Sequence, residues 1–418
     1  MRNHWLFLIK IGLLFLLLLA KSCDGAEENI TDPASQARPL VLLISIDGFS
    51  IDYLQQFSTP TLDSLAQVGI SADALIPVFP SKTFPNHYTQ VTGLYPRNHG
   101  IISNRMYDRE FDEYFTIGTQ GTASRDGKWY QGEPIWVTAS KQKLITATMF
   151  WPGSEAEIMG ARPHYYFPFN GEIPESERVV QVITWIETDL NPPNLITLYF
   201  EQVDQAGHLH GPYSGAVEDV VAVVDEHLND LFNGIKKLGK IENLNIIVVS
   251  DHGMAEISRD RVIFLDEYIS LDQIEVVNWS PVLEIIPLEG TEKMVYDQLK
   301  GAHRHLQVYR KDNTPENWHF DKHRRITPII GLADPGWSVS SKRYFEEHPN
   351  AYTGGTHGYD PLVPSMHGIF IATGPGFRSG FKIGPVESVH LYELLCELLG
   401  IIPAPNDGNL RVWEKALQ

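Results

Sequence analysis

Acidic and histidine side chains follow several apolar runs of this sequence. Aspartates end such runs in "SIDG", "FEQVDQAGH" and "VVSDHG", and the Gly-rich stretch "TGGTHGYD" supplies a further histidine. Together these motifs contain the candidate metal ligands Asp47, Asp204, His208, Asp251, His252 and His357. Oxygen and imidazole ligands without thiolate suit zinc, with manganese as a second choice. The set is large enough for two ions, and two dications about 4 Å apart can clamp both oxygens of an in-line phosphoryl transfer.

Each of these residues also has a structural interpretation. Asp-Gly is common in turns, and a single histidine is more often a packing residue than a ligand. The joint occurrence favours a metal site, because carboxyl ends of parallel strands meet at one edge of a sheet. His210 and His367 stand near the same motifs, and we interpret them as supporting or structural residues.

The stretch "FPSKTFPNHYTQVTGLYP" places a hydroxyl, Thr83, at the start of a predicted helix. Serine and threonine are favoured N-caps, which is the structural interpretation. Beside a dication the same hydroxyl becomes a nucleophile, because coordination lowers its pKa. A helix N-terminus also favours a phosphate, so we predict that Thr83 is the nucleophile. The neighbouring Lys82 either helps to neutralise phosphate or lies on the solvent side.

The elements that must position these residues can be predicted from apolar runs. "PLVLLISIDGF", "PNLITLYFEQVD", "NLNIIVVSDHGM" and "HGIFIATGPGF" are typical of strands buried on both faces of a sheet, with helical stretches between them. This alternation predicts an α/β fold with a doubly wound, mainly parallel central sheet flanked by helices. Residues 257–349 interrupt the pattern and are predicted to form an inserted cap subdomain within a catalytic domain over residues 39–418.

The N-terminus and the overall charge bear on location and partners. Residues 1–22 are typical of a secretory signal peptide, although an uncleaved anchor or lipidation at Cys23 would also fit, and residues 23–38 are predicted to be a flexible tether. The chain has only two cysteines, Cys23 and Cys396, so cleavage after Cys23 would leave no possible intrachain disulfide. An exported protein without disulfides favours the bacterial periplasm or envelope over an animal cell surface, with secretion as the alternative. The net charge of −19 argues against a stable nucleic-acid complex.

The motifs resemble those of the nucleotide pyrophosphatase/phosphodiesterases of the alkaline phosphatase superfamily. The similar stretches include "SIDGF", "PVFPSKTFPNHYTQVTGLYPRNHGIISNRMYD", "FWPGSE", "LYFEQVDQAGHLHGP", "VVSDHGM" and "GGTHGYD", in the family's order. The resemblance covers nearly all of the chain after residue 39. It implies an alkaline phosphatase-like fold and two zinc ions.

The resemblance also assigns roles to individual residues. It implies that Asp204, His208 and His357 hold one zinc, and that the other is held by Asp47, Thr83, Asp251 and His252. Asn104 would donate a side-chain hydrogen bond to a nonbridging phosphate oxygen, helped by the Thr83 backbone N–H. A turn is the structural interpretation of Asn104.

Aromatic residues near these motifs would bind the substrate's base. The resemblance implies that Phe84 and Tyr199 sandwich a nucleobase and that Trp151 shapes the same pocket. The family often has tyrosine where this chain has Phe169, so one hydroxyl is missing from the pocket. All four could instead be core residues.

The resulting hypothesis is a di-zinc phosphodiesterase that releases nucleoside 5′-monophosphates through a phosphothreonine intermediate. A phosphodiesterase for choline-type lipid headgroups is the nearest alternative, since an aromatic cage also binds quaternary ammonium. A metal-stabilised binding protein is the non-enzyme alternative. The sequence does not decide the oligomeric state, or whether the N-terminus attaches the protein to a membrane.

Overall fold

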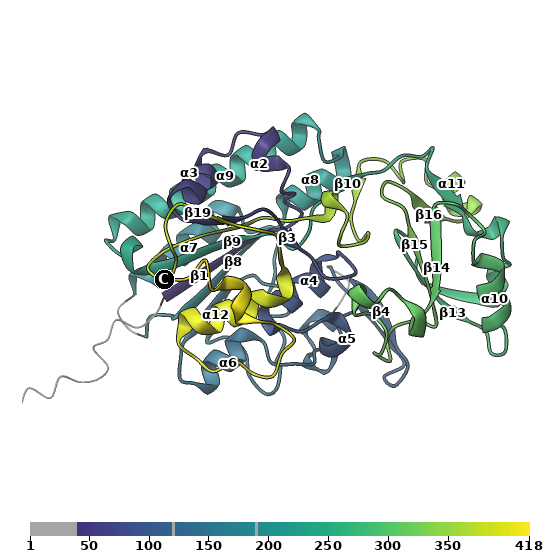
Figure 1. Cartoon of the computed structure of the whole chain (residues 1–418), viewed down its shortest axis with the longest axis horizontal. Coiled ribbons are helices and arrows are strands. Elements are labelled where there is room, and N and C mark those ends of the chain that lie inside the picture. The colour runs from purple at the N-terminus through teal and green to yellow at the C-terminus, as the bar shows by residue number, and fades with distance from the viewer. Residues whose placement is uncertain (1–39, 119–121, 189–190) are drawn as a thin grey trace, which may run out of the picture. The chain divides into compact units, whose positions relative to one another are not determined.

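The computed structural model describes residues 40–118, 122–188 and 191–418, which belong to one unit, Pro39–Gln418 (Figure 1). The predicted signal peptide and tether, with Cys23, lie outside the described residues. Cys396 is buried and forms no disulfide with any described residue. Among the helices of the described part, none is long and apolar enough to cross a membrane.

A central sheet of eight strands is formed, in the order β19-β2-β18-β9-β1-β8-β6-β7. The middle strands β9, β1 and β8 run parallel, and β6 and β7 continue in the same direction. These five strands are β1 (Leu40–Ile46), β6 (Thr146–Met149), β7 (Tyr165–Tyr166), β8 (Leu195–Phe200) and β9 (Leu244–Val249). The predicted mainly parallel α/β sheet is confirmed.

The direction of one strand differs from the prediction. The run "HGIFIATGPGF" forms β18 (Phe370–Thr373), which is antiparallel to both β9 and β2 (Ile70–Ala72). We expected it to continue the parallel pattern, and that expectation is wrong. A continuous apolar run reports burial on both faces, which does not specify strand direction. β19 (Phe381–Ile383) runs parallel to β2 at the edge.

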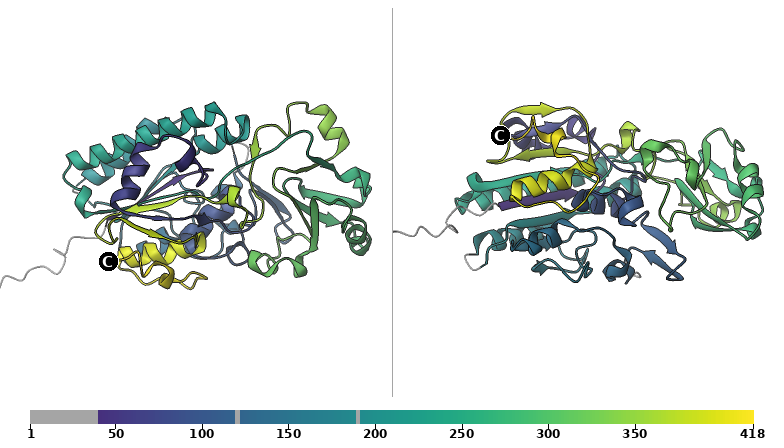
Figure 2. Two further views of the ribbon diagram at one scale, coloured as in Figure 1. Left: turned by 45° about the horizontal axis from the view of Figure 1, so that its top comes forward. Right: turned by 60° about the horizontal axis from the view of Figure 1, so that its bottom comes forward.

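Helices cover both faces of the sheet (Figures 1 and 2). On one face lie α3 (Pro60–Val68), α7 (Glu175–Glu187), α8 (Gln202–His210) and α9 (Gly215–Lys237). On the other face lie α4 (Thr83–Thr92), α6 (Ile135–Lys141) and α12 (Leu391–Leu399). The fully buried residues of β1 show why its sequence is a continuous apolar run: Val41 and Leu43 enter the core beside α4 and α12, whereas Leu42, Ile44 and Ile46 enter the core beside α7 and α9.

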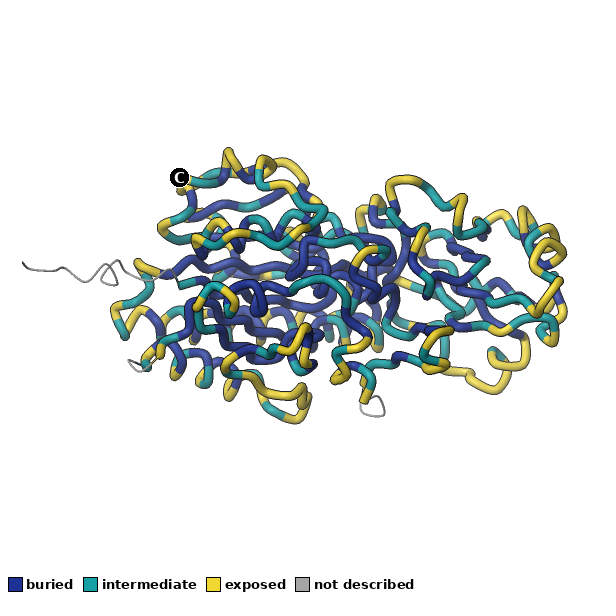
Figure 3. The backbone as a smooth tube through the Cα atoms, turned by 90° about the horizontal axis from the view of Figure 1, so that it is seen from below, coloured by how far each residue is buried: buried dark blue, intermediate teal, exposed yellow. Residues whose placement is uncertain are grey.

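The range predicted for the insert contains a second, antiparallel sheet with the strand order β12-β13-β15-β14. The strands are β12 (Ile274–Asn278), β13 (Val282–Pro287), β14 (Leu306–Arg310) and β15 (Ile329–Ala333), and the helix α10 (Glu292–Leu299) lies between β13 and β14 in the chain. The insert has a hydrophobic core of its own, which includes Leu283, Ile285 and Leu299. Figure 3 shows this burial as dark blue stretches apart from those of the central strands.

Short elements join these layers. The helices are α2 (Tyr53–Gln56), α5 (Pro96–His99) and α11 (Lys342–Glu347). The paired short strands are β3 (Leu75–Ile76) with β20 (Val386–Glu387), β4 (Arg105–Asp108) with β5 (Glu113–Thr116), β10 (Ala255–Glu256) with β17 (Gly355–Thr356), and β11 (Val262–Phe264) with β16 (Ser338–Ser340).

Candidate active site

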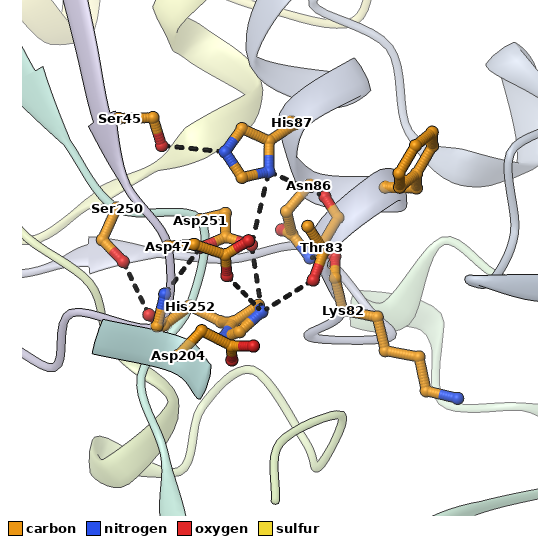
Figure 4. A network of polar contacts seen from close by, with 12 residues as sticks. Ser45, Asp47, Lys82, Thr83, Asn86, His87, Asp204, Ser250, Asp251 and His252 are labelled. Carbon is orange, nitrogen blue, oxygen red and sulfur yellow. Dashed lines mark hydrogen bonds and ion pairs between the residues drawn. The ribbon is translucent and has the colours of Figure 1, made fainter. Parts of the chain in front are cut away.

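The predicted ligands gather at the carboxyl ends of the three middle strands. Asp47 directly follows β1, and Asp251 and His252 follow β9 after Ser250. Asp204 lies in the first turn of α8, four residues after the end of β8. Because β9, β1 and β8 are adjacent and parallel, their ends bring together residues that are far apart in the chain. Figure 4 shows these side chains pointing toward a common centre.

Thr83 is the first residue of α4 and is not the N-cap. Lys82 occupies the N-cap position and makes no side-chain capping bond. The Thr83 hydroxyl lies 3.4 Å from His252 Nε2 (Figure 4). The loop before it is held instead by Asn86, whose Nδ2 donates to the carbonyls of Pro80 and Lys82 at 3.0 Å. The capping interpretation is therefore wrong, and the hydroxyl faces the predicted ligands.

The three residues predicted for one metal site lie together. His208 Nε2 is 3.5 Å from Asp204 Oδ2, and His357 Nε2 is 3.6 Å from Asp204 Oδ1. The Nε2 atoms of His208 and His357 are 3.1 Å apart. Such a cluster of one carboxylate and two imidazoles, all facing inward, is a suitable donor set for zinc.

The residues predicted for the second site are adjacent to the first. His252 Nε2 lies 3.0 Å from Asp251 Oδ2 and 3.4 Å from Asp47 Oδ1. The ring of His252 stacks on that of His357, with 3.6 Å between centroids. In these positions Asp204, His252 and His357 can share one ion, and Asp47 and Asp251 can share another with His87. His252 thus lies between the two groups.

The orientation of the histidines fits metal binding. The Nδ1 atoms of three of them hydrogen-bond to backbone carbonyls: His208 to Gly355 at 2.9 Å, His252 to Gly253 at 2.9 Å and His357 to Ser81 at 2.8 Å. A hydrogen bond from one ring nitrogen to a carbonyl fixes the tautomer and leaves the other nitrogen free to coordinate. All three rings therefore present Nε2 to the centre.

The carboxylates are crowded in a buried space. Burial, together with the nearby charges of Asp251 and Asp204, raises the pKa of Asp47 well above its usual value. Burial also acts to raise the pKa of Asp251, but His252 and His87 hold it well below its usual value. Among the described residues, Asp47 Oδ1, Asp204 Oδ1 and Asp251 Oδ2 have no hydrogen-bond partner. Unpartnered buried oxygens of like charge fit a centre that holds dications.

His87 is a buried residue of this site that the sequence interpretation missed. Its Nε2 lies 2.8 Å from the hydroxyl of Ser45, and its Nδ1 lies 3.0 Å from the carbonyl of Thr83 and 3.4 Å from Asp251 Oδ2 (Figure 4). Both ring nitrogens are thus engaged, which favours a supporting role over coordination. Its position four residues after Thr83, on the same face of a helix, is the sequence signal that could have found it.

Asn104 lies beside the start of α4, as its predicted role requires. Its amide oxygen accepts a hydrogen bond of 2.9 Å from the backbone N–H of Phe84. This bond leaves the Nδ2 hydrogens as the donors for a phosphate oxygen. Lys82 is only 8% exposed, and its Nζ donates to Ser103 Oγ at 3.3 Å, so the solvent-side interpretation of Lys82 is wrong.

The four predicted substrate aromatics differ in exposure. Tyr199 is 7% exposed, and its hydroxyl donates to Asp47 Oδ2 at 2.5 Å. Trp151 is 3% exposed and donates from Nε1 to the His87 carbonyl at 3.2 Å. Phe84 is half-buried, and Phe169 is 43% exposed. Phe84 and Phe169 therefore have the larger accessible ring surfaces, and Tyr199 and Trp151 are the buried members of the set.

The two additional histidines lie differently. His210 is exposed at the last position of α8. His367 is half-buried, and its backbone carbonyl accepts from Ile51 N–H at 3.0 Å. Neither belongs to the groups of side chains that could share a metal ion among the described residues.

Comparison with known proteins agrees with this geometry. The family model described as type I phosphodiesterase / nucleotide pyrophosphatase matches residues 41–360. The chain belongs to this family. Human ectonucleotide pyrophosphatase/phosphodiesterase family member 5 is 38% identical over 370 residues, which cover 88% of this chain and 76% of the human protein. The bis(5′-adenosyl)-triphosphatase of Xenopus laevis is 36% identical over 91% of this chain and 82% of its own length.

Solved structures of the family have the same fold. Murine ectonucleotide pyrophosphatase/phosphodiesterase 5 matches with a TM-score of 0.86 and 37% identity, covering 91% of this chain and 100% of the murine chain. A second structure is that of an inactive threonine-to-alanine variant of the murine protein in complex with AMP, with the same TM-score and coverage. The alkaline phosphatase-like fold and the assignment to a family of phosphodiester and phosphoanhydride hydrolases are thereby confirmed.

Proposed function

We propose that this chain is an exported, di-zinc nucleotide phosphodiesterase and pyrophosphatase in which Thr83 is the nucleophile. The observation that carries the proposal is the position of the Thr83 hydroxyl, at the first residue of α4, free of capping and 3.4 Å from His252 Nε2. The inactive threonine variant of the murine relative, which binds AMP, supports a threonine nucleophile and a nucleotide ligand.

The donor set fits two zinc ions. Asp204, His208 and His357 would hold one ion. Asp47, Thr83, Asp251 and His252 would hold the other. When bound, two dications activate the nucleophile and neutralise charge on the phosphate. Manganese stays the second choice for the same donors.

The positions of Thr83 and Asn104 indicate the part of each in the reaction. Thr83 Oγ forms a bond to phosphorus while the bond to the leaving group breaks in line, and the threonine proton passes to solvent water. Asn104 donates to a nonbridging oxygen, which is worth a few kcal/mol in comparable sites. Water then cleaves the phosphothreonine, which restores the hydroxyl and releases a nucleoside 5′-monophosphate.

The substrate's base would stack between Phe84 and Tyr199, and Phe169, whose ring centroid lies 6.1 Å from that of Tyr199, would add the most exposed ring of the pocket. Stacking tolerates every base, because each has a π-face. Phe169 lacks the hydroxyl of the tyrosine that is frequent at this position, so we expect stacking rather than hydrogen bonding there. The hydrogen bond from the Tyr199 hydroxyl to Asp47 would fix the orientation of the Tyr199 ring.

We further propose that residues 39–418 form the catalytic domain and that residues 257–349 act as its cap. Trp318 of this range stacks on Phe79 of the nucleophile loop with 3.9 Å between ring centroids, and its Nε1 donates to Asp360 at 2.8 Å. Export is supported by the relatives, whose names describe them as ectoenzymes. A bacterial envelope location and a membrane attachment stay predictions.

A rate comparison on purified, zinc-loaded protein tests the proposal. The substrates are p-nitrophenyl thymidine 5′-monophosphate, p-nitrophenylphosphocholine and, as a monoester control, p-nitrophenyl phosphate. We expect the thymidine ester to be preferred and Thr83→Ala to lower kcat by at least about a thousandfold. Thr83→Ser, which keeps the hydroxyl, should retain part of the activity.

The other outcomes separate the alternatives. Preference for the choline ester would keep the metal mechanism and replace the nucleotide by a lipid headgroup. Turnover by Thr83→Ala at the wild-type rate would remove Thr83 as nucleophile. Zinc binding without turnover of any ester would favour the binding-protein alternative.

A further inference from the structure

A buried ion pair contacts Phe150, which in turn packs against Phe169, and it belongs to none of the metal-ligand groups among the described residues. Arg178 in α7 and Glu201, between β8 and α8, have side chains that are 0% and 6% exposed. Two parallel hydrogen bonds join them, from Nη1 to Oε2 at 2.5 Å and from Nη2 to Oε1 at 2.9 Å. A buried pair of this kind is weak evidence for a contribution to stability, because desolvation offsets the attraction between the charges.

The remaining donors of Arg178 connect two segments that carry proposed substrate contacts. Nε donates to the carbonyl of Ile173 at 3.0 Å, four residues after Phe169, and Nη1 donates to the carbonyl of Tyr199 at 3.0 Å. Glu201 occupies the N-cap position of α8, but its side chain makes no capping bond there. The pair therefore ties the segment after Phe169 to the end of β8.

Arg178 also supports the aromatic wall through ring contacts. Its guanidinium carbon lies 4.9 Å from the ring centroid of Phe150. Phe150 meets Phe169 edge-on, with 5.2 Å between centroids, and Phe169 lies 6.1 Å from Tyr199. Phe169 is 43% exposed, and these ring contacts on one side orient its accessible face together with the hydrogen bond from its backbone N–H to Glu155 Oε2 at 3.2 Å.

We propose that Arg178 and Glu201 form a positioning pair that holds Phe169 in place for a nucleobase, and so sets the selectivity for nucleoside esters over phosphodiesters without a base. The inference rests on the proposed nucleotide function. The planar guanidinium is required, because its donors reach Glu201 and two carbonyls at once, which the ammonium of lysine cannot match.

The test compares two diesters on zinc-loaded protein: p-nitrophenyl thymidine 5′-monophosphate and methyl p-nitrophenyl phosphate, which has no base. For Arg178→Lys we expect KM for the thymidine ester to rise about tenfold, in line with the loss of one stacking partner. The kcat for that ester and both constants for the methyl ester should stay within about threefold of wild type. Glu201→Gln, which keeps the size and one acceptor oxygen, should move the same KM in the same direction by less.

Arg259→Lys is the matched control. Its guanidinium also donates to backbone carbonyls, those of Phe345, His348 and Ala351, and lies 3.7 Å from the ring centroid of Phe345. These partners include no proposed site residue, so the control should change neither ester's kinetics. AMP affinity, measured by titration calorimetry, should fall about tenfold in Arg178→Lys and stay unchanged in Arg259→Lys.

The outcomes distinguish the inference from the function on which it rests. A wild type without preference for the thymidine ester overturns both. A wild-type preference that Arg178→Lys and Glu201→Gln retain overturns the positioning pair alone. An equal loss for both esters in both variants also overturns it, because that pattern indicates a general structural role.

Discussion

The rim of the central sheet and the interior of the insert are both buried, but they contain opposite kinds of side chain. At the rim, Asp47, Asp251 and His252 are at most 2% exposed, and carboxylate oxygens there lack hydrogen-bond partners among the described residues. In the insert, residues such as Ile285 and Leu299 are fully buried in an apolar core. The apolar core explains the stability of its region, whereas the rim opposes stability and is explained by a function.

The rim can persist because the strands below it carry apolar cores on both faces. β1 places alternate side chains in two separate clusters, and Asp47 follows at its end. Sites that break the rules of local stability are expected where chemistry is performed, with the cost met by the surrounding fold. If this difference between the regions is correct, rim changes alter activity and metal response, whereas insert changes alter stability.

The largest effect should follow removal of metal from the rim. Treatment with a chelator is expected to lower activity by at least about a thousandfold, because several kcal/mol of Lewis-acid stabilisation are lost. It should also lower the free energy of unfolding by about 2.7 kcal/mol for each ion that was present at a hundred times its dissociation constant. Assay rates and urea denaturation with and without added zinc measure both effects.

Two aspartate variants sharpen this prediction. Asp47→Asn should weaken the zinc-dependent gain in stability without destabilising the metal-free protein, since it relieves repulsion from Asp251 and Asp204. Asp225→Asn is the matched control: its carboxylate accepts from the backbone N–H groups of Thr61 and Leu62. It should lose about 1.5–3 kcal/mol of stability and keep the zinc response. The same behaviour in both variants would contradict the assignment of Asp47 as a ligand.

An intermediate effect is expected from the insert's core. Leu299→Ala should lower the free energy of unfolding by about 2–5 kcal/mol, because a buried side chain is replaced by a cavity. The kcat per folded molecule should stay within about twofold. The control Met294→Ala, on the exposed side of α10, should change stability by about 0.5 kcal/mol or less. Lost activity at unchanged stability in Leu299→Ala would show that the two regions are not separable in this way.

The smallest effect should come from Glu284 of the insert strand β13, whose charge interacts with that of Lys82 beside Thr83. Burial raises its pKa from 4.5 to about 7, although Lys82 and Arg105, with hydrogen bonds from Asn278 and Ser103, act against the shift. Because the folded state binds the proton more tightly, stability should fall as pH rises from 4.5 to about 7, by at most about 3 kcal/mol. Urea denaturation across this range should give a flatter profile for Glu284→Gln. Parallel profiles for wild type and variant would rule out this contribution.

Much of the candidate site could be predicted from local sequence signals. The aspartates follow apolar strands, and Thr83 stands beside a helix start, so residue type and position point to the same edge of the sheet. His87, Ser45 and Arg178 were not predicted, because their importance depends on partners that are distant in sequence: Asp251 for His87 and Glu201 for Arg178.

The error about Lys82 has the same origin. Lys82 is buried, its ammonium donates to Ser103, and the charge of Glu284 in the insert acts on its pKa; neither neighbour is visible in its own segment. Tyr199 lies where its motif predicts, but the burial of its ring and the hydrogen bond of its hydroxyl to Asp47 depend on the tertiary structure.

The sequence by itself determined the α/β class, the family and the types of side chain available as metal ligands. Apolar runs, the residues that follow them and the family motifs are local properties of the chain. Only the tertiary structure decided that β18 runs antiparallel, that His252 lies between the two ligand groups and that Arg178 supports the aromatic wall. Strand direction, the sharing of ligands and burial depend on which segments pack together. That packing is settled by the whole core rather than by any one segment.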